Sequence, residues 1–431
     1  MCLSGAPNPS RRDFLDGAVH GWYRTVMGYS DELVGQLLDL FGVRAGQRVL
    51  DPFCGSGTTL VECMKRGIDC VGIDASPASC FASRVKTQWR LRSSRLLELL
   101  EEIENSLLGS RPLGRLLLRD PTTAYLTASG MIERGWISPE PLRKAIAVKE
   151  CIRSLRTTHL YKDALMLALL SEVVDSASNV KFGPELYCGP AKVDSDVVEG
   201  FSRRVRATAK DLDAVSRLAH GTAQVLLGDS RECHELLERF APRPYDAVIC
   251  SPPYPAEHDY TRNSRLELAF LEVVSDRKTL QTIKRRMIRS NTKGIYKGDN
   301  DVALVAGHPA IGAIVAELSE RIRGKSHGFA RLYPRVVEEY FGGMKRHLLS
   351  VRRSLLPGAH CAYVLGDQAS YLRVYIPTAS ILSMIAEEVG FETLEIKPWR
   401  NRWSSSTSRG IGENILVLRR REMEDVQQWP K

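Results

Sequence analysis

The sequence lacks the features that mark membrane, secreted and zinc-dependent proteins. No stretch approaches the roughly 18 to 20 uncharged apolar residues of a membrane-spanning helix, and Met1 to Asp16 has no apolar signal-peptide core. The ten cysteines include no Cys-x-x-Cys pair and no His cluster at zinc-site spacing, so we expect buried thiols and no metal site. Internal repeats and low-complexity tracts are also absent. These absences predict a soluble globular protein that stays inside the cell.

The composition allows a large core and leaves the partner open. With 43% hydrophobic and 26% charged residues, a chain of 431 residues has room for a catalytic domain and sizeable insertions. A net charge of +9 fits a polyanionic partner, although so modest an excess is common in basic housekeeping enzymes. The position of the charge is therefore more informative than its sum.

Short apolar runs that end in a polar residue predict an open, Rossmann-like α/β sheet. The run from Arg48 to Asp51, a Gly-rich turn and helical spacing from Thr58 predict strand, loop and helix, and the run from Cys70 to Asp74 predicts a second strand. Such sheets bind ligands at the carboxyl ends of parallel strands. Five further strands are predicted at residues 225–229, 246–250, 361–367, 391–396 and 414–418.

Two long segments interrupt this strand pattern. Residues 86–222 contain leucine-rich stretches at helical spacing and predict a helical insertion. Residues 276–335 predict a second insertion, which is basic because residues 277–298 contain many Lys and Arg and no acid. The catalytic domain is then predicted to comprise residues 17–85, 223–275 and 336–420.

The loop Asp51-Pro-Phe-Cys-Gly-Ser-Gly57 is the first candidate for a ligand site. Its glycines allow a tight turn and close approach of a ligand, and the helix from Thr58 directs its N-terminus at the bound group. Neither a Gly-Lys-Ser/Thr phosphate loop nor a Gly-x-Gly-x-x-Gly fingerprint is present, whereas a methionine-sulfonium cofactor needs no phosphate cradle. We predict S-adenosylmethionine as the cofactor. Its predicted ligands in this loop are Asp51, Pro52, Phe53, Gly55, Gly57 and Thr58.

Three residues outside the loop are further candidates for cofactor binding. Asp74 follows the second strand, where an acid can accept hydrogen bonds from ribose hydroxyls, and its alternative role is a solvated strand end. Asp229 follows the third strand and is placed either to meet the adenine amine or to cap the helix predicted at residues 231–240. Ser30 precedes a helical stripe as its N-cap and is a candidate ligand for the methionine end of the cofactor.

The tetrapeptide Ser251-Pro252-Pro253-Tyr254 directly follows the fourth predicted strand. Two prolines lock the backbone and remove two donors, which leaves carbonyls free to accept hydrogen bonds. Methylation of an exocyclic amine is helped by acceptors of this kind, because the nitrogen lone pair is otherwise delocalised into the ring. Tyr254 offers a face on which a base could stack. The alternative is a rigid turn, but its position in the same sheet as the Gly-rich loop favours a catalytic motif.

Together the two motifs resemble those of the amino-methyltransferases of bacterial and archaeal DNA modification. The sequence matches the family's Asp-Pro-Phe-x-Gly-x-Gly loop and its (Ser/Asn/Asp)-Pro-Pro-(Tyr/Phe) motif, in the non-permuted order. The resemblance covers residues 23–83 and 225–270 and, more loosely, 355–419. It implies a seven-stranded sheet with one antiparallel strand, a flipped base and direct methyl transfer to nitrogen. The break at residues 86–222 departs from the usual layout and leaves the place of target recognition open between the two insertions.

This resemblance leads to a hypothesis with ranked alternatives. Ser251 in the first position resembles N4-cytosine enzymes more than N6-adenine enzymes, so we expect a sequence-specific DNA (cytosine-N4) methyltransferase in a bacterial or archaeal cytoplasm. A cognate restriction endonuclease is a candidate partner. The alternatives are an N6-adenine enzyme, an RNA base methyltransferase and a catalytically silent DNA-recognition subunit. Cys250 precedes Ser251 in an apolar strand, which excludes it as the nucleophile of C5-cytosine chemistry.

Basic residues in two places are the candidates for DNA binding. The acid-free run could face phosphates, although a charge run is usually a solvated face, and residues 399–403 interleave aromatic and basic side chains that could contact DNA or merely cover a sheet edge. The predicted DNA-binding residues are Lys284, Arg285, Arg286, Arg289, Lys293, Arg400 and Arg402.

Overall fold

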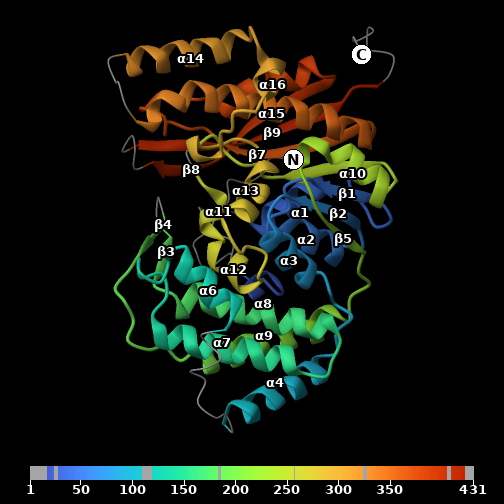
Figure 1. The fold of residues 1–431 in the computed structure, drawn as a ribbon. Helices are drawn as coiled ribbons and strands as arrows, with labels where there is room; N and C mark the ends of the chain where they lie inside the picture. Colours follow the sequence, from blue (N-terminus) through green and yellow to red (C-terminus); the bar gives the residue numbers. More distant parts are fainter. Residues whose placement is uncertain are drawn as a thin grey trace.

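A seven-stranded sheet forms the centre of the molecule (Figure 1). The computed structural model describes residues 17–23, 28–108, 119–182, 186–256, 258–323, 328–404 and 409–422, apart from the side chains of 402–404 and 409. The strands are β1 (Arg48–Asp51), β2 (Asp69–Asp74), β5 (Ala223–Leu227), β6 (Tyr245–Cys250), β7 (Leu355–Gly366), β8 (Phe391–Ser404) and β9 (Arg409–Arg420). Each corresponds to a predicted strand, so the Rossmann-like α/β fold is confirmed.

The sheet order is β5-β2-β1-β6-β7-β9-β8, and its first five strands pair in parallel. Strand β9 pairs antiparallel with both of its neighbours, as the resemblance implies, so β8 runs in the same direction as β7. The carboxyl ends of β1, β2, β5, β6 and β7 therefore meet at one edge of the sheet, which is where open α/β sheets bind their ligands.

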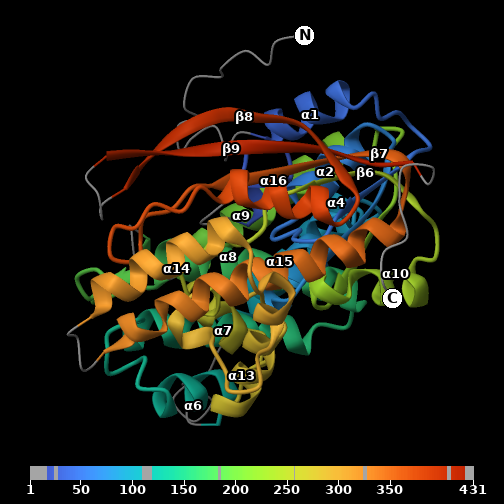
Figure 2. The same cartoon turned by 90° about the horizontal axis from the view of Figure 1, so that it is seen from above.

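Alternate residues of the buried strands face two separate cores. Val49 and Ile249 belong to one core, whereas their neighbours Leu50 and Val248 belong to the other. The first core contains α1 (Asp31–Leu40), α2 (Thr58–Lys65) and α3 (Pro77–Lys86). The second contains α10 (Cys233–Phe240), α15 (Tyr333–Ser354) and α16 (Thr378–Glu388), which Figure 2 shows from above. Within the described ranges, no helix has both the length and the apolar character needed to cross a bilayer.

The segment after α3 is mainly helical and packs at one end of the molecule (Figure 1). Its helices are α4 (Ser93–Leu108), α6 (Pro121–Ala128), α7 (Pro139–Ser154), α8 (His159–Glu172) and α9 (Val197–Val215). It also contains the hairpin of β3 (Val180–Phe182) and β4 (Leu186–Cys188), which helical spacing does not predict. Its buried residues continue the first core without a break, so these helices are stabilised by packing against α1 to α3.

The basic segment is divided between two places. Helix α13 (Arg277–Arg285) lies near the middle of the molecule with α11 (Tyr260–Asn263) and α12 (Arg265–Phe270), as Figure 1 shows. Helix α14 (Pro309–Ile322) instead packs on α15 and contributes to the second core. Only the first part of this segment is therefore close to the ligand-binding edge of the sheet.

Candidate active site

The conformation of the Gly-rich loop depends on glycines within the loop and in the neighbouring strand β2. Gly55 and Gly57 have φ of +49° and +86°, a region that L side chains rarely adopt. A Cβ on Gly57 would lie 3.3 Å from the Ser83 Cα, and a Cβ on Gly72 of β2 would lie 2.8 Å from the Cys54 Cβ. The loop thus lies directly against β2 and α3, and Gly57 is the N-cap of α2.

Two aspartates, one buried and one partly buried, hold the loop in place. Asp51 accepts hydrogen bonds from the backbone N of Phe53 (3.0 Å) and the hydroxyl of Tyr29 (3.1 Å), and burial raises its pKa to about 7. Asp74 accepts from the backbone N of Gly55 (2.9 Å) and of Ser76 (2.8 Å), and burial raises its pKa to about 6. Asp74 therefore connects the loop to the end of β2.

One cavity of about 700 Å³ joins the two predicted motifs, and its size is typical of ligand sites. Its lining includes Pro52, Phe53, Gly55, Thr58 and Asp74 from the cofactor side and Ser251, Pro252, Pro253 and Tyr254 from the catalytic side. Phe53, Met287 and Ile288 give part of the wall an apolar character. Ser30, Asp51, Gly57 and Asp229 do not line the cavity.

The tetrapeptide presents hydrogen-bond acceptors to this cavity. The hydroxyl of Ser251 donates to the carbonyl of Val364 on β7 (3.2 Å) and lies 3.3 Å from the hydroxyl of Tyr254, which leaves one of its two lone pairs for a ligand. The carbonyl of Pro253 accepts from the hydroxyl of Tyr340 (3.0 Å), whereas the carbonyl of Pro252 has no donor among the described residues. Among the described residues, the acceptors left for a ligand are therefore one lone pair of Ser251 Oγ and the carbonyl of Pro252.

Neighbouring elements fix the position of Tyr254. Its backbone N donates to the Tyr260 hydroxyl (2.9 Å), and its own hydroxyl lies 3.4 Å from the carbonyl of Val364. Gly366 lies so close that a Cβ there would be 2.8 Å from the Tyr254 ring. Tyr260 is close enough in sequence to Tyr254 to be expected near the pocket, although no specific role was predicted for it. Tyr340 and Gly366 are supports that sequence reasoning missed, because no local pattern connects them to the motif.

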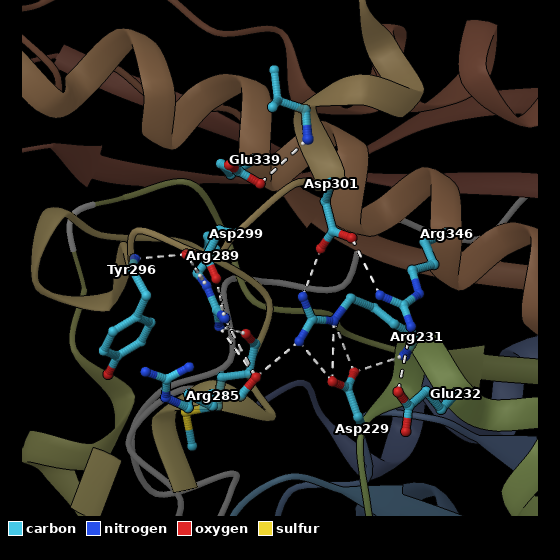
Figure 3. Close-up of polar contacts among 12 residues, drawn as sticks. Asp229, Arg231, Glu232, Arg285, Arg289, Tyr296, Asp299, Asp301, Glu339 and Arg346 are labelled. Atoms are coloured by element: carbon cyan, nitrogen blue, oxygen red, sulfur yellow. Dashed lines mark hydrogen bonds and ion pairs between the residues drawn. The ribbon is translucent and has the colours of Figure 1, made fainter. Parts of the chain in front are cut away.

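Two expected cofactor ligands have other roles in the structure. Asp229 accepts from the backbone N of Arg231 (2.9 Å) and forms an ion pair with the Arg231 guanidinium (2.6 Å), as Figure 3 shows. Asp229 therefore acts as a helix cap, the second of the two roles considered for it, and its carboxylate is bound by Arg231. Ser30 accepts from the backbone N of Leu33 (3.2 Å) as the N-cap of α1. Its neighbour Tyr29 lines the cavity instead.

Two buried guanidiniums shape the turn that follows α13 (Figure 3). Arg231 donates to the carbonyl of Arg285 (2.9 Å) and pairs with Asp301 (2.6 Å). Arg289 is 4% exposed, pairs with Asp299 (2.7 Å) and donates to backbone carbonyls that include that of Arg285. Together they hold residues 286–288 against the cavity that those residues line.

The predicted DNA-binding residues therefore separate into distinct groups. Arg285 and Lys293 are exposed, and Arg286 lines the cavity. Lys284 pairs with Asp259 (2.6 Å), and Arg400 pairs with the buried Glu413 beside the cavity. The acid-free run is therefore partly neutralised by two acids outside it, Asp259 and Asp299. The side chain of Arg402 lies outside the described residues.

A second cavity, of about 590 Å³, lies beside α11. It has walls from the helical insertion, from the segment after the tetrapeptide and from the basic segment. Its lining residues are Met131, Arg134, Trp136, Cys188, Asp259, Arg262, Arg265 and Lys293. Four cations thus surround one acid, and that acid already pairs with Lys284.

The sheet and the two motifs around one cavity are the features of a Rossmann-like methyltransferase, and the family that the sequence matches implies S-adenosylmethionine as methyl donor. Residues 30–83 match the family model described as DNA methylase (N6_N4_Mtase). The chain is 25% identical to the Type II methyltransferase M.BsoBI of Geobacillus stearothermophilus over 94% of this chain and 84% of that protein. It is 26% identical to M.AvaI of Nostoc sp. over 87% of this chain and 79% of that protein. The resemblance to the amino-methyltransferases is thereby confirmed.

Among solved structures, the rRNA methyltransferase AviRa of Streptomyces viridochromogenes aligns over 97% of this chain and 95% of that chain. Its TM-score is 0.34 and its sequence identity 11%.

Proposed function

We propose that the protein is a DNA methyltransferase that transfers a methyl group from S-adenosylmethionine to the exocyclic N4 amine of cytosine within a specific sequence. The observation that carries this proposal is a pair of acceptors, one lone pair of Ser251 Oγ and the Pro252 carbonyl, in the cavity that the Gly-rich loop also lines. DNA is proposed as the substrate because the relatives are Type II methyltransferases and the matched family model is described as DNA methylase. A cognate restriction endonuclease is proposed as a functional partner on the same grounds.

The chain's own residues account for activation of the amine. An amine N–H that donates to Ser251 Oγ and another that donates to the Pro252 carbonyl withdraw the nitrogen from conjugation with the ring and direct its lone pair outward. Tyr254, held by Tyr260 and Gly366, supplies the face on which the flipped base stacks. When bound, the cofactor supplies the electrophilic methyl group, and preorganised acceptors lower the barrier to transfer.

The residue in the first motif position favours cytosine over adenine. Ser251 has a hydroxyl that donates to Val364, contacts the Tyr254 hydroxyl and keeps one lone pair for the amine, and serine in this position resembles N4-cytosine enzymes. N6-adenine methylation is the alternative, because an adenine amine presents the same N–H donors. Mass spectrometry of DNA incubated with the protein and isotope-labelled cofactor distinguishes N4-methylcytosine from N6-methyladenine. N6-methyladenine as the sole product would contradict the proposed target.

The catalytic role of the tetrapeptide is tested by Ser251→Ala. We expect loss of one acceptor to lower kcat about a hundredfold while the cofactor Kd stays within about twofold, because the energy is realised only as the amine is reshaped. Tyr254→Ala is expected to lower turnover as well, through loss of base stacking. Ser216→Ala, on the exposed end of α9, is the matched control. Unchanged turnover in Ser251→Ala would contradict the mechanism.

The DNA backbone is proposed to follow the second cavity and the exposed end of α13. Arg134, Arg262 and Lys293 reach this cavity from three separate segments, and Arg285 is exposed nearby in sequence. Cations from both insertions can therefore bind phosphates on either side of a flipped base. Target recognition is proposed to involve both insertions for the same reason.

A further inference from the structure

The active-site cavity contains two buried charged side chains that the methyl-transfer chemistry does not use. Lys86, at the end of α3, and Glu267, in α12, both line the cavity and are each 2% exposed. Neither residue lies in the two motifs. Buried charges are costly unless they are paired, so their surroundings are informative.

Glu267 has an unused carboxylate oxygen. One oxygen accepts from the hydroxyl of Tyr23, and the other, Oε2, is buried without a hydrogen-bond partner among the described residues. Asp175 lies near enough to raise the pKa of Glu267 further, and burial with this repulsion brings that pKa to about 7. The site around Glu267 therefore has an excess of negative charge that a cation would relieve.

Lys86 is a buried cation that lacks a carboxylate partner among the described residues. Its Nζ donates to the backbone carbonyls of His20 and Tyr23, each at 3.1 Å, and it forms no ion pair with a described carboxylate. An ammonium has three N–H donors, so one remains for a ligand. Burial lowers the pKa of Lys86 to about 7, and an anion beside it would restore the charged form.

Tyr23 connects the two charges, because its hydroxyl binds Glu267 and its carbonyl binds Lys86. Two other acids lie at this end: Glu62 contacts both His20 (2.8 Å) and Lys65 (2.7 Å), and the carboxylate of Asp31 lies within 4.8 Å of His20 and Glu62. Among the described residues, this end of the cavity thus offers the unused oxygen of Glu267 and an ammonium, that of Lys86, without an ion-pair partner. That combination matches the ammonium and carboxylate of a free amino acid.

We propose that Lys86 and Glu267 bind the amino-acid end of S-adenosylmethionine, with Glu267 accepting from the α-ammonium and Lys86 donating to the α-carboxylate. This role deepens the cofactor assignment and replaces the one expected for Ser30, whose hydroxyl caps α1. The apolar wall of Phe53, Met287 and Ile288 is left for the adenine.

Binding measurements with product analogues test this proposal without turnover. S-adenosylhomocysteine carries the amino-acid end, its decarboxylated analogue keeps only the amine, and 5′-methylthioadenosine has neither group. Isothermal titration calorimetry of the unaltered protein is expected to show S-adenosylhomocysteine binding about a hundredfold more tightly than 5′-methylthioadenosine, as two charged hydrogen bonds predict. Equal affinities would overturn the proposal whether or not any variant folds.

Two variants assign the separate contacts. Glu267→Gln is expected to weaken S-adenosylhomocysteine about tenfold or more and to leave 5′-methylthioadenosine within about twofold. Lys86→Met is expected to weaken S-adenosylhomocysteine similarly but not the decarboxylated analogue. Glu32→Gln and Lys210→Met, both exposed away from the cavity, are the matched controls. A loss that is equal for all three ligands would overturn the assignment. Because DNA is absent from these titrations, failure of DNA methylation would leave their outcome unaffected.

Discussion

At the scale of single residues, the site contains several acids that are largely surrounded by protein. Asp51, Asp74 and Glu267 all have raised pKa values because they are buried, and only part of their charge is compensated by hydrogen bonds. Such groups lower the stability of the ligand-free protein and favour binding of a positively charged ligand. The cofactor is cationic at both its sulfonium and its ammonium.

The pH dependence of stability follows from the sign of these shifts. The folded-state pKa of Glu267 is raised from 4.5 to about 7, so the stability linked to its protonation is fully present below pH 4.5 and is lost as the pH rises through 7. Tyr23 and Asp175 face this carboxylate, and Glu267→Gln removes the charge. Without cofactor, the free energy of unfolding of the variant relative to that of the parent is expected to rise by about 2 kcal/mol between pH 5 and pH 8. Urea unfolding of both proteins at the two pH values measures this difference. The same difference in free energy of unfolding at pH 5 and pH 8 would contradict the prediction.

Individual residue roles were predictable only where the motif itself fixes the geometry. Ser251 to Tyr254 and the loop around Gly55 line the cavity because strand ends and glycine conformations are local properties. Asp229 and Arg289 differ, because the choice between ligand and ion pair depends on Arg231 and Asp299. Tyr340 and Glu267 are distant in sequence from their contacts and have no local signal.

At the scale of elements, the turn after α13 depends on two internal cations. The last carbonyls of a helix need donors, and here Arg231 and Arg289 supply them from within the protein. Arg231 also pairs with Asp229 and Asp301, so it connects the end of β5 to the segment that packs on α15 (Figure 3). Removing it would leave two poorly solvated carboxylates together.

Arg231→Met is therefore expected to lower the free energy of unfolding by about 3 to 5 kcal/mol, the usual cost of leaving buried ion-pair partners uncompensated. Arg346→Met is the matched control, because Arg346 contacts the same Asp301 at 3.5 Å but is 44% exposed, and we expect at most about 1 kcal/mol for it. Chemical denaturation of both variants makes the comparison. Equal losses would show that the Arg231 pairs contribute no more than a surface ion pair.

The elements themselves were largely predictable from hydrophobic periodicity. All seven strands of the sheet and the helical character of residues 86–222 follow from apolar spacing. The hairpin of β3 and β4 was not predicted, because three-residue strands are too short to show alternation of apolar and polar residues. The separation of α14 from α13 also escaped, since the sequence does not specify which core a helix joins.

At the scale of the whole molecule, the two insertions converge beside the catalytic segment. Arg134 comes from the helical insertion, Arg262 follows the tetrapeptide and Lys293 belongs to the basic segment, yet all three line one cavity. Their sequence separation explains why net charge alone gave only a weak indication of DNA binding. The fold concentrates positive charge that the sequence distributes.

This convergence predicts the salt dependence of DNA binding. Replacing Arg262 and Lys293 together by Gln should reduce the slope of log Kobs against log salt by about 1 to 2, since each phosphate contact contributes about 0.9. The double variant Lys210→Gln and Arg217→Gln on the exposed end of α9 and beyond is the control. Fluorescence anisotropy with duplex DNA measures both slopes, and cofactor affinity should not change. An unaltered slope would show that Arg262 and Lys293 do not contact DNA phosphates.

The cavity that joins the two motifs has a consequence for biosynthesis. Its lining extends from His20 to Glu413, and the sheet beneath it pairs β2 with a strand about 150 residues later. Contacts of such long range form late in folding, because the intervening chain must first be brought together. A ribosome-bound chain that lacks β9 therefore lacks part of the cavity wall, however well its first core has formed. Ligand binding therefore requires that nearly the entire polypeptide has folded, and it stabilises the whole chain against unfolding.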